Sequence, residues 1–371
     1  MTSMDSKASS RIWKTTDGSF LDDNDRFLFF STERFVRDIC LGHSCLICGA
    51  DPKQKLFNDE HVIPQWILHK YDLYNRQMTL SNGTKLPYRQ NTVPCCAECN
   101  GFLGRSLEEP MLELMTNGFD AFSAGLQDAI PIVFRWLCLT VFKNHYRDRL
   151  LRMDRDRRAP DVKLGDQYTW DELHHMHTMA RSTYSGADIE SDVQGSLLIF
   201  QVKKTDLEET FDYVDLYPAQ AVLLRVEDIG IVAVLNDSCG ASQVFRNSGL
   251  ADRIAGGSIS NVQLREILAH LATINMHLKE RPRYRTEVNG DAGTCTIRVT
   301  LPPQLEVDES AEDDFGSVME TACGELIRAS TVNSEEVLEH VRKGTYTFLF
   351  KEDGTFNDQC LVVMPPIGNS S

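Results

Sequence analysis

The stretch CCAECN, residues 95–100, places Cys96 and Cys99 two residues apart, and CLIC, residues 45–48, has the same spacing earlier in the chain. A two-residue gap lets a tight turn aim both thiolates at one ion, and two such pairs are typical of a tetrahedral zinc site. A long insertion separates the two pairs. The sequence predicts a structural zinc ion with four ligands, which are Cys45, Cys48, Cys96 and Cys99.

Other cysteines and histidines leave alternatives open. Cys95 is a second choice in place of Cys96, and Cys40 and His43 lie close to the first pair. A predicted helix carries three histidines, and residues three apart share a face, which offers a less favoured second metal site. These histidines are His174, His175 and His177. The scattered cysteines lack ligand spacing and are interpreted as core residues: Cys138, Cys239, Cys295, Cys323 and Cys360.

The insertion contains NDEHVIPQWI, residues 58–67, in which Glu60 directly precedes His61. Successive side chains of a regular strand point to opposite faces, so this pair converges on one group only if the strand ends or bends there. Pro64 cannot donate to a sheet ladder, which indicates that a loop follows.

Read in order, the two cysteine pairs, the Glu-His-Val-Ile-Pro element at 60–64, Asn91 and Asn100 resemble the zinc-stapled branch of the HNH, or ββα-metal, endonuclease family. The resemblance covers about residues 40–110 and rests on four elements that agree in order. It implies a treble-clef-like ββα-metal module.

The resemblance also implies roles. His61 matches the general base that activates water, and Glu60 and Asn100 match the ligands of one divalent cation, Mg²⁺ or Mn²⁺. Asn91 matches the residue that holds the loop carrying the histidine. The cation polarises the scissile phosphate and stabilises the departing 3′ oxygen.

Basic residues supply candidates for contact with the substrate. Arg105 lies where the family often has a lysine, and a guanidinium can pair two oxygens of one phosphate. The segment 135–158 is rich in arginine and contributes Lys143 and Arg147, although a solvated helix end would have the same composition.

Composition indicates a globular protein of two or three domains. The chain has 371 residues, 42% hydrophobic and 25% charged, with a net charge of −16. The first 160 residues are close to neutral, so the remainder carries nearly all of this charge and is a poor surface for phosphate. We expect an α+β fold in four parts: a helical lead-in at 1–40, the HNH module at 41–110, a helical region at 111–185, and a separate acidic α+β domain with a mainly antiparallel sheet at 186–371.

Hydrophobic patterning predicts the elements of these parts. Helices are expected at 24–41, after Cys99, at 131–152, from 169, at 261–279 and twice within 314–343. Short strands are expected from about residue 190 to 235. Hairpins are expected at Asn82-Gly83, across 287–299, and at Asp353-Gly354.

Function follows as an expectation from these features. The N-terminal residues do not resemble a secretory signal, and the apolar run AIPIVFRWLCLTVF is 14 residues long, shorter than the roughly 20 that span a bilayer. We therefore expect a cytoplasmic DNA endonuclease without membrane contact, of a phage-defence or restriction-like kind. A ligand, protein partner or second copy acting on the C-terminal domain would control it. The alternative is a non-catalytic zinc-knuckle protein that binds nucleic acid or serves as a scaffold.

Overall fold

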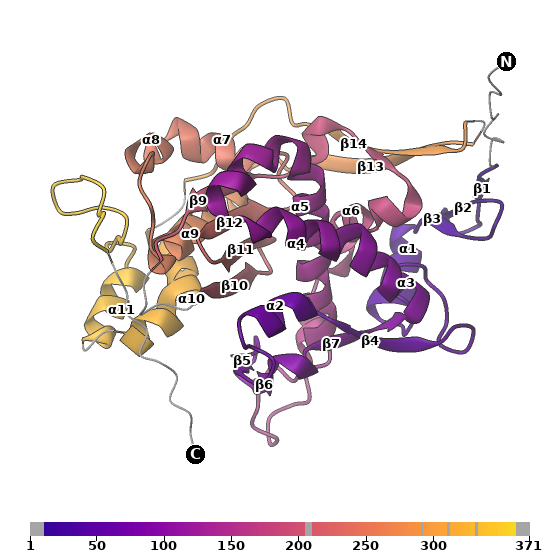
Figure 1. The fold of residues 1–371 in the computed structure, drawn as a ribbon, viewed down its shortest axis with the longest axis horizontal. Helices are drawn as coiled ribbons and strands as arrows, with labels where there is room; N and C mark the ends of the chain where they lie inside the picture. The colour runs from indigo at the N-terminus through magenta and orange to yellow at the C-terminus, as the bar shows by residue number, and fades with distance from the viewer. Residues whose placement is uncertain (1–10, 205–209, 291, 310–311, 331–332, 361–371) are drawn as a thin grey trace. The chain divides into compact units, whose positions relative to one another are not determined.

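The computed structural model describes residues 11–204, 210–290, 292–309, 312–330 and 333–360, and Figure 1 traces them from indigo to yellow. The chain forms two compact units. Unit 1 comprises Met1–Leu112, Ile132–Val193 and Tyr284–Val299, and unit 2 comprises Glu113–Pro131, Gln194–Arg283 and Thr300–Ser371. The predicted helical region at 111–185 is thus largely part of the same unit as the two cysteine pairs.

Unit 1 contains four small sheets. Three are antiparallel, and in the fourth β8 runs parallel to β14 in the order β13-β14-β8. The strands of the first sheet are β1 (Trp13–Lys14), β2 (Phe20–Leu21) and β3 (Phe27–Phe29); the others are β4 (Phe57–His61) with β7 (Thr92–Cys96), β5 (Gln77–Thr79) with β6 (Lys85–Pro87), and β8 (Asp188–Ile189) with β13 (Arg283–Asn289) and β14 (Thr294–Thr300).

One helix packs directly on the β4–β7 pair. Figure 1 shows α3 following β7 directly, and α3 packs on both β4 and β7. The α-helices of the first half of the chain are α1 (Thr32–Arg34), α2 (Gln65–Lys70), α3 (Ala97–Leu103), α4 (Glu109–Thr116), α5 (Gly118–Asp148) and α6 (His174–Ser185). The segment Glu113–Pro131, which holds the end of α4 and the start of α5, belongs to unit 2. Two π-helical segments, Phe35–Cys40 and Gly104–Glu108, extend α1 and α3, and short 3-10 turns lie at Tyr88–Gln90, Leu164–Gln167, Trp170–Leu173 and Ser191–Val193.

The helix predicted over 24–41 begins only at Thr32, and the lead-in before it is a three-stranded sheet. Phe30, Phe35 and Ile39 are buried as their spacing predicted. Phe27 belongs to β3, which pairs with β2, and strand pairing overrides the near-helical spacing at this position.

The helix predicted over 131–152 is longer at its start and shorter at its end. It is α5, which runs from Gly118 to Asp148, and Val133, Leu137 and Val141 are fully buried along it. The basic residues after Asp148 lie in turns, so the basic helix end is not formed. By length and composition α5 is also the one described helix that could cross a bilayer, a test that buried core helices pass as well; 56% of its apolar window is buried.

Unit 2 is built on an antiparallel sheet of order β10-β11-β12-β9, as the short apolar runs predicted. Figure 1 shows α9 beside this sheet, with α10 and α11 beyond it. The strands are β9 (Leu197–Gln201), β10 (Phe211–Leu216), β11 (Ala221–Val226) and β12 (Ile229–Val234), and the helices are α7 (Gly240–Asn247), α8 (Leu250–Ile254), α9 (Asn261–Met276), α10 (Glu312–Ser330) and α11 (Ser334–Arg342).

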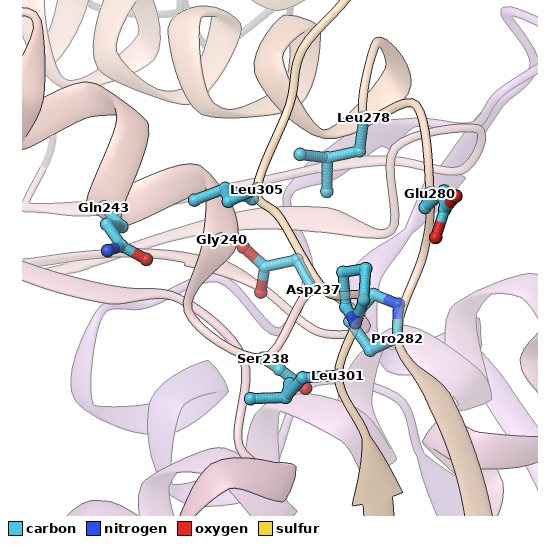
Figure 2. Close-up of a pocket in the computed structure, with 10 residues that line it drawn as sticks. Asp237, Ser238, Gly240, Gln243, Leu278, Glu280, Pro282, Leu301 and Leu305 are labelled. Carbon is cyan, nitrogen blue, oxygen red and sulfur yellow. The ribbon is translucent and has the colours of Figure 1, made fainter.

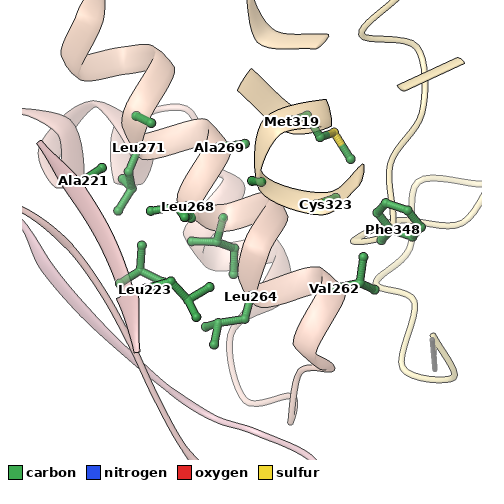
Figure 3. Packing of buried hydrophobic residues seen from close by; sticks show 14 of the residues in the cluster. Ala221, Leu223, Val262, Leu264, Leu268, Ala269, Leu271, Met319, Cys323 and Phe348 are labelled. Carbon is green, nitrogen blue, oxygen red and sulfur yellow. The ribbon is translucent and has the colours of Figure 1, made fainter. Parts of the chain in front are cut away.

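The core of unit 2 lies between the sheet and its helices (Figure 3). Leu223 of β11 meets Leu264 and Leu268 of α9, and Met319 and Cys323 of α10 close the other side of that helix. Full burial of each leucine contributes about 1.5–3 kcal/mol. The mixed α+β fold class with antiparallel sheets is confirmed.

The last predicted hairpin forms only in part. Its turn is present, with Gly354 at φ +79° and one isolated bridge between Phe350 and Phe356. No strand is assigned there up to Cys360, and residues 361–371 lie outside the described part of the chain. The hairpins at Asn82-Gly83 and across 287–299 do form, as β5–β6 and β13–β14.

Candidate metal centre and active site

The four predicted cysteine ligands meet in unit 1. The sulfur atoms of Cys45, Cys48, Cys96 and Cys99 all lie within 4.8 Å of one another. A tetrahedral ion with bonds of about 2.3 Å places its sulfur ligands about 3.8 Å apart, and the Cys48 and Cys96 Sγ atoms are separated by 3.7 Å. The cluster is compatible with a zinc ion.

The chemistry of the cluster also fits a cation. Hydrogen bonds from the thiols of Cys48, Cys95 and Cys99 hold the pKa of Cys45 well below its ordinary value. The same sharing with Cys45 raises the pKa of Cys48 to about 12. One thiolate is therefore favoured in the cluster, and a bound cation would displace the remaining protons.

The structure selects among the alternative ligands. The Sγ atom of Cys95 lies 3.7 Å from that of Cys45, but Cys95 is not a member of the group of four whose sulfur atoms all lie within 4.8 Å of one another. Cys40 is fully buried and His43 is exposed, and neither joins the group.

Helix α6 supports the first cysteine pair from behind. His177 Nε2 lies 2.7 Å from the Leu46 carbonyl oxygen, and the Arg181 guanidinium donates to the Ile47 carbonyl. Leu46 and Ile47 are the two residues between Cys45 and Cys48. Arg181 is 2% exposed. Its guanidinium interacts electrostatically with Cys45, Cys48 and Cys99.

The three histidines of α6 are structural side chains. His174 Nε2 lies 2.8 Å from the Phe30 carbonyl oxygen, and the His175 ring stacks on Tyr284. Burial lowers the pKa of His174 to about 4 and that of His175 to about 3, and it lowers the pKa of His177 as well. The cysteine cluster is the one metal-ligand group among the described residues, so a second site on α6 is not formed.

His61 ends β4, next to the start of β7. It pairs with Thr92, and the Val62 amide donates to the Asn91 carbonyl oxygen at 2.9 Å. The backbone of Asn91 thus contacts the residue that follows His61. The Asn91 side chain is 1% exposed, and neither amide atom makes a hydrogen bond to the described residues.

The two ring nitrogens of His61 have different surroundings. Nε2 is buried, whereas Nδ1 lies 3.3 Å from the Gln65 amide nitrogen at an exposed position on α2. Burial lowers the pKa of His61, with Glu60 opposing and Lys143 reinforcing the effect. An amide nitrogen can only donate, so Nδ1 is the acceptor of this bond and the unprotonated nitrogen of the neutral ring. A neutral imidazole at neutral pH is suited to accept a proton at this nitrogen once water replaces the Gln65 amide.

The Glu60 side chain is buried and forms an ion pair. Its carboxylate accepts from Lys143 Nζ at 2.8 Å, and the two side chains are 7% and 1% exposed. Glu108 Oε1 lies 4.0 Å from the same ammonium, and burial raises the pKa of Glu108 to about 7. Lys143 therefore neutralises Glu60 from inside and does not face an open surface, which does not fit its expected contact with substrate phosphate.

The strand ends at His61, before the loop that Pro64 indicated, but it does not bend between Glu60 and His61. Both residues keep regular pairing in β4, opposite Val93 and Thr92, so their side chains leave the strand on opposite faces. Asn100 Nδ2 donates to Asn58 Oδ1 at 3.0 Å and to the Asp59 carbonyl at 3.3 Å. This arrangement does not fit a divalent cation held by Glu60 and Asn100.

Among the other predicted substrate contacts, Arg105 is exposed in the π-helical segment after α3, and Arg147 is half-buried near the end of α5. Of the scattered cysteines, Cys138, Cys295 and Cys323 are buried as predicted. Cys360 is half-buried, and Cys239 is exposed, contrary to expectation.

Unit 2 contains a pocket at the N-terminal end of α7 (Figure 2). Leu278, Leu301 and Leu305 contribute apolar walls, and Gln243 and Glu280 contribute polar groups. Nothing in the sequence pattern predicted it, because its lining comes from α7 and from loops that are distant in sequence.

Sequence reasoning missed the support residues of the site. Gln65, Glu108 and Arg181 all contact a site residue, or the backbone beside one, through a side chain. Gln65 lies only four residues after His61, so its contact with His61 could have been predicted from the sequence. The other two depend on contacts between distant segments and carry no local signal.

No family model matches this chain, and no curated protein or solved structure matches it either.

Proposed function

We propose that this protein is a metal-dependent nuclease of the HNH type that hydrolyses phosphodiester bonds in DNA. The observation that carries the proposal is the position of His61 on a strand pair and helix, β4–β7–α3, with the cysteine cluster at the junction of β7 and α3. Its Nδ1 accepts a hydrogen bond from the Gln65 amide and is therefore unprotonated in the neutral ring, and this and its lowered pKa suit a general base.

In this proposal each group has a limited task. The four cysteines would hold zinc, and zinc bound there would fix the start of α3 against β7. His61 takes a proton from the attacking water, and Asn91 fixes the backbone beside it. Arg105 is the exposed basic residue that is assigned to the phosphate backbone.

The catalytic cation is the part of the proposal that rests on the resemblance alone. Mg²⁺ or Mn²⁺ is the expected ion, yet Glu60 is paired with Lys143 and Asn100 is turned to Asn58. A requirement for added metal is therefore a separate test from the role of His61.

Unit 2 is assigned a regulatory role, in keeping with a cytoplasmic defence or restriction-like effector. Most of the net negative charge lies in the C-terminal half of the chain, and negative charge repels DNA. The pocket beside α7 offers a place for a small ligand with an apolar body, and a protein partner or second copy is the other proposed source of control.

The test is cleavage of supercoiled plasmid by purified full-length protein with Mg²⁺, with Mn²⁺ or with EDTA. His61→Ala is compared with His69→Ala, which removes an exposed histidine of the adjacent α2. The proposal expects cleavage by the wild type and by His69→Ala, and at least a hundredfold loss in His61→Ala at equal zinc content. Equal rates in the two variants would exclude His61 as the base.

A second candidate function is favoured by the pairing of Glu60 with Lys143. A zinc-held module without an open carboxylate is suited to binding nucleic acid or protein without cleaving it. DNA retention at low salt by both wild type and His61→Ala, with no cleavage in any metal, would select this alternative.

A further inference from the structure

The Lys143 ammonium makes three contacts at the buried side of β4. Nζ is 2.8 Å from Glu60 Oε1, 4.0 Å from Glu108 Oε1 and 2.7 Å from the carbonyl oxygen of His61. The Lys143 side chain is 1% exposed, so water does not screen these contacts. One cation thus binds both the carboxylate before His61 and the backbone of His61 itself.

We propose that the Lys143 ammonium is the permanent counter-ion of Glu60 and that Lys143 positions His61. In this proposal Glu60 forms an ion pair with Lys143 and is not a ligand of a divalent ion. The proposal rests on the proposed function only in taking His61 as the base. It accounts for a glutamate directly before the histidine in a strand that does not bend.

Strand geometry supports this division. Glu60 pairs with Val93 and His61 with Thr92, so the carboxylate points into unit 1 while the imidazole lies on the other face, toward Gln65. Lys143 reaches the backbone between these faces. Its bond to the His61 carbonyl oxygen holds the backbone at the end of the strand.

Electrostatics opposes a divalent ion at Glu60. Such an ion would have to displace the ammonium or share the carboxylate with it at close range. Displacement would leave Lys143 buried without its nearest counter-charge, and an unpaired buried charge is strongly unfavourable. The built-in pair therefore occupies the position that the resemblance gives to a metal ligand.

The first test measures metal binding without reference to activity. Mn²⁺ is titrated into zinc-loaded full-length wild type, Glu60→Gln and the neutral pair Glu60→Gln/Lys143→Met by calorimetry. We expect the Mn²⁺ affinities to agree within about twofold. A tenfold or greater loss in Glu60→Gln with normal zinc content would make Glu60 a metal ligand and overturn the proposal.

The second test is a double-mutant cycle on the unfolding equilibrium. Glu60→Gln and Lys143→Met should each lower the folding equilibrium constant. The folding constant of the double variant should be at least tenfold higher than the value expected if the two losses in free energy were additive. The exposed pair Lys163–Asp161, with a 2.7 Å contact, is the control and should couple by no more than about fivefold. Additive effects at Glu60 and Lys143 would overturn the pairing.

The third test separates positioning from mere stability. The charged groups acting on the pKa of His61 are Glu60, Lys143 and Asp59, and the ammonium lowers it. The acidic limb of the pH–rate profile should therefore move to higher pH in Lys143→Met, which a simple loss of folded protein would not cause. An unmoved limb with an unchanged rate would refute the positioning role. If the wild type neither cleaves DNA nor binds Mn²⁺, the proposed function fails, and the cycle still decides whether Lys143 and Glu60 are paired.

Discussion

Replacing Arg181 by methionine should weaken zinc binding although Arg181 is not a ligand. Its guanidinium donates to the Ile47 carbonyl between Cys45 and Cys48, and to the Phe27 carbonyl at 2.7 Å. Methionine fills much of the same volume but donates neither bond. The loop between Cys45 and Cys48 then loses the hydrogen bond that the charged guanidinium donates to the Ile47 carbonyl.

The structure sets the size of this effect. Two hydrogen bonds from a charged group, each worth about 1.5–3 kcal/mol, give a loss of at least about 3 kcal/mol. Complete coupling to the metal site would weaken zinc binding about a hundredfold, and partial coupling about tenfold. Arg181 also places positive charge near the thiolates, which acts in the same direction.

The assay is competition for zinc between the protein and a chromogenic chelator. Arg181→Lys keeps the charge without the forked geometry and should fall between wild type and Arg181→Met. Arg158→Met removes an arginine that is 91% exposed and should match wild type. If Arg181→Met is folded and its zinc affinity is within twofold of that of wild type, the hydrogen bonds from α6 do not contribute to zinc binding and the reasoning is refuted.

Three further predictions follow from the site. Cys96→Ser should lose zinc and Cys95→Ser should keep it, as measured by metal content after dialysis; equal loss in both would contradict the assignment of Cys96. The cleavage rate should rise with pH through an apparent pKa below 6.5, because burial lowers the pKa of His61 and the base must be neutral; a limb above 6.5 would contradict this. Burial raises the pKa of Glu108 from 4.5 to about 7, so its contribution to stability is present below about pH 4.5 and is lost as pH rises through 7. The difference in unfolding free energy between wild type and Glu108→Gln should change over that range, and a flat difference would exclude the shift.

Local spacing predicted the parts of this molecule in which the chemistry repeats over a few residues. The two Cys-x-x-Cys pairs fix turns that aim sulfur at one point, and the structure brings their four sulfur atoms together. Alternating or continuous apolar runs likewise predicted β9 to β12, because a buried sheet requires them.

The sequence could not reveal contacts between distant segments. Lys143 reads as one member of a basic run, and only the fold shows that it pairs with Glu60, 83 residues away. The strand β3 was also missed, since the spacing of Phe27, Phe30 and Phe35 matches a helix and the competing partner, β2, is a tertiary neighbour. The predicted burial of Phe30 and Phe35 is confirmed, whereas the helical conformation predicted for Phe27 is wrong.

The most direct test of the central claim is the chemical nature of a cut. Supercoiled plasmid is incubated with zinc-loaded wild type or His61→Ala and a divalent cation, and the nicked product is then treated with DNA ligase. Hydrolysis with the 3′ oxygen as leaving group predicts nicks that ligase seals, formed by wild type and reduced at least a hundredfold in His61→Ala. Intact plasmid with wild type in every metal, or equal nicking by His61→Ala at the same zinc content, would contradict the assignment of this protein as a nuclease with His61 as its base.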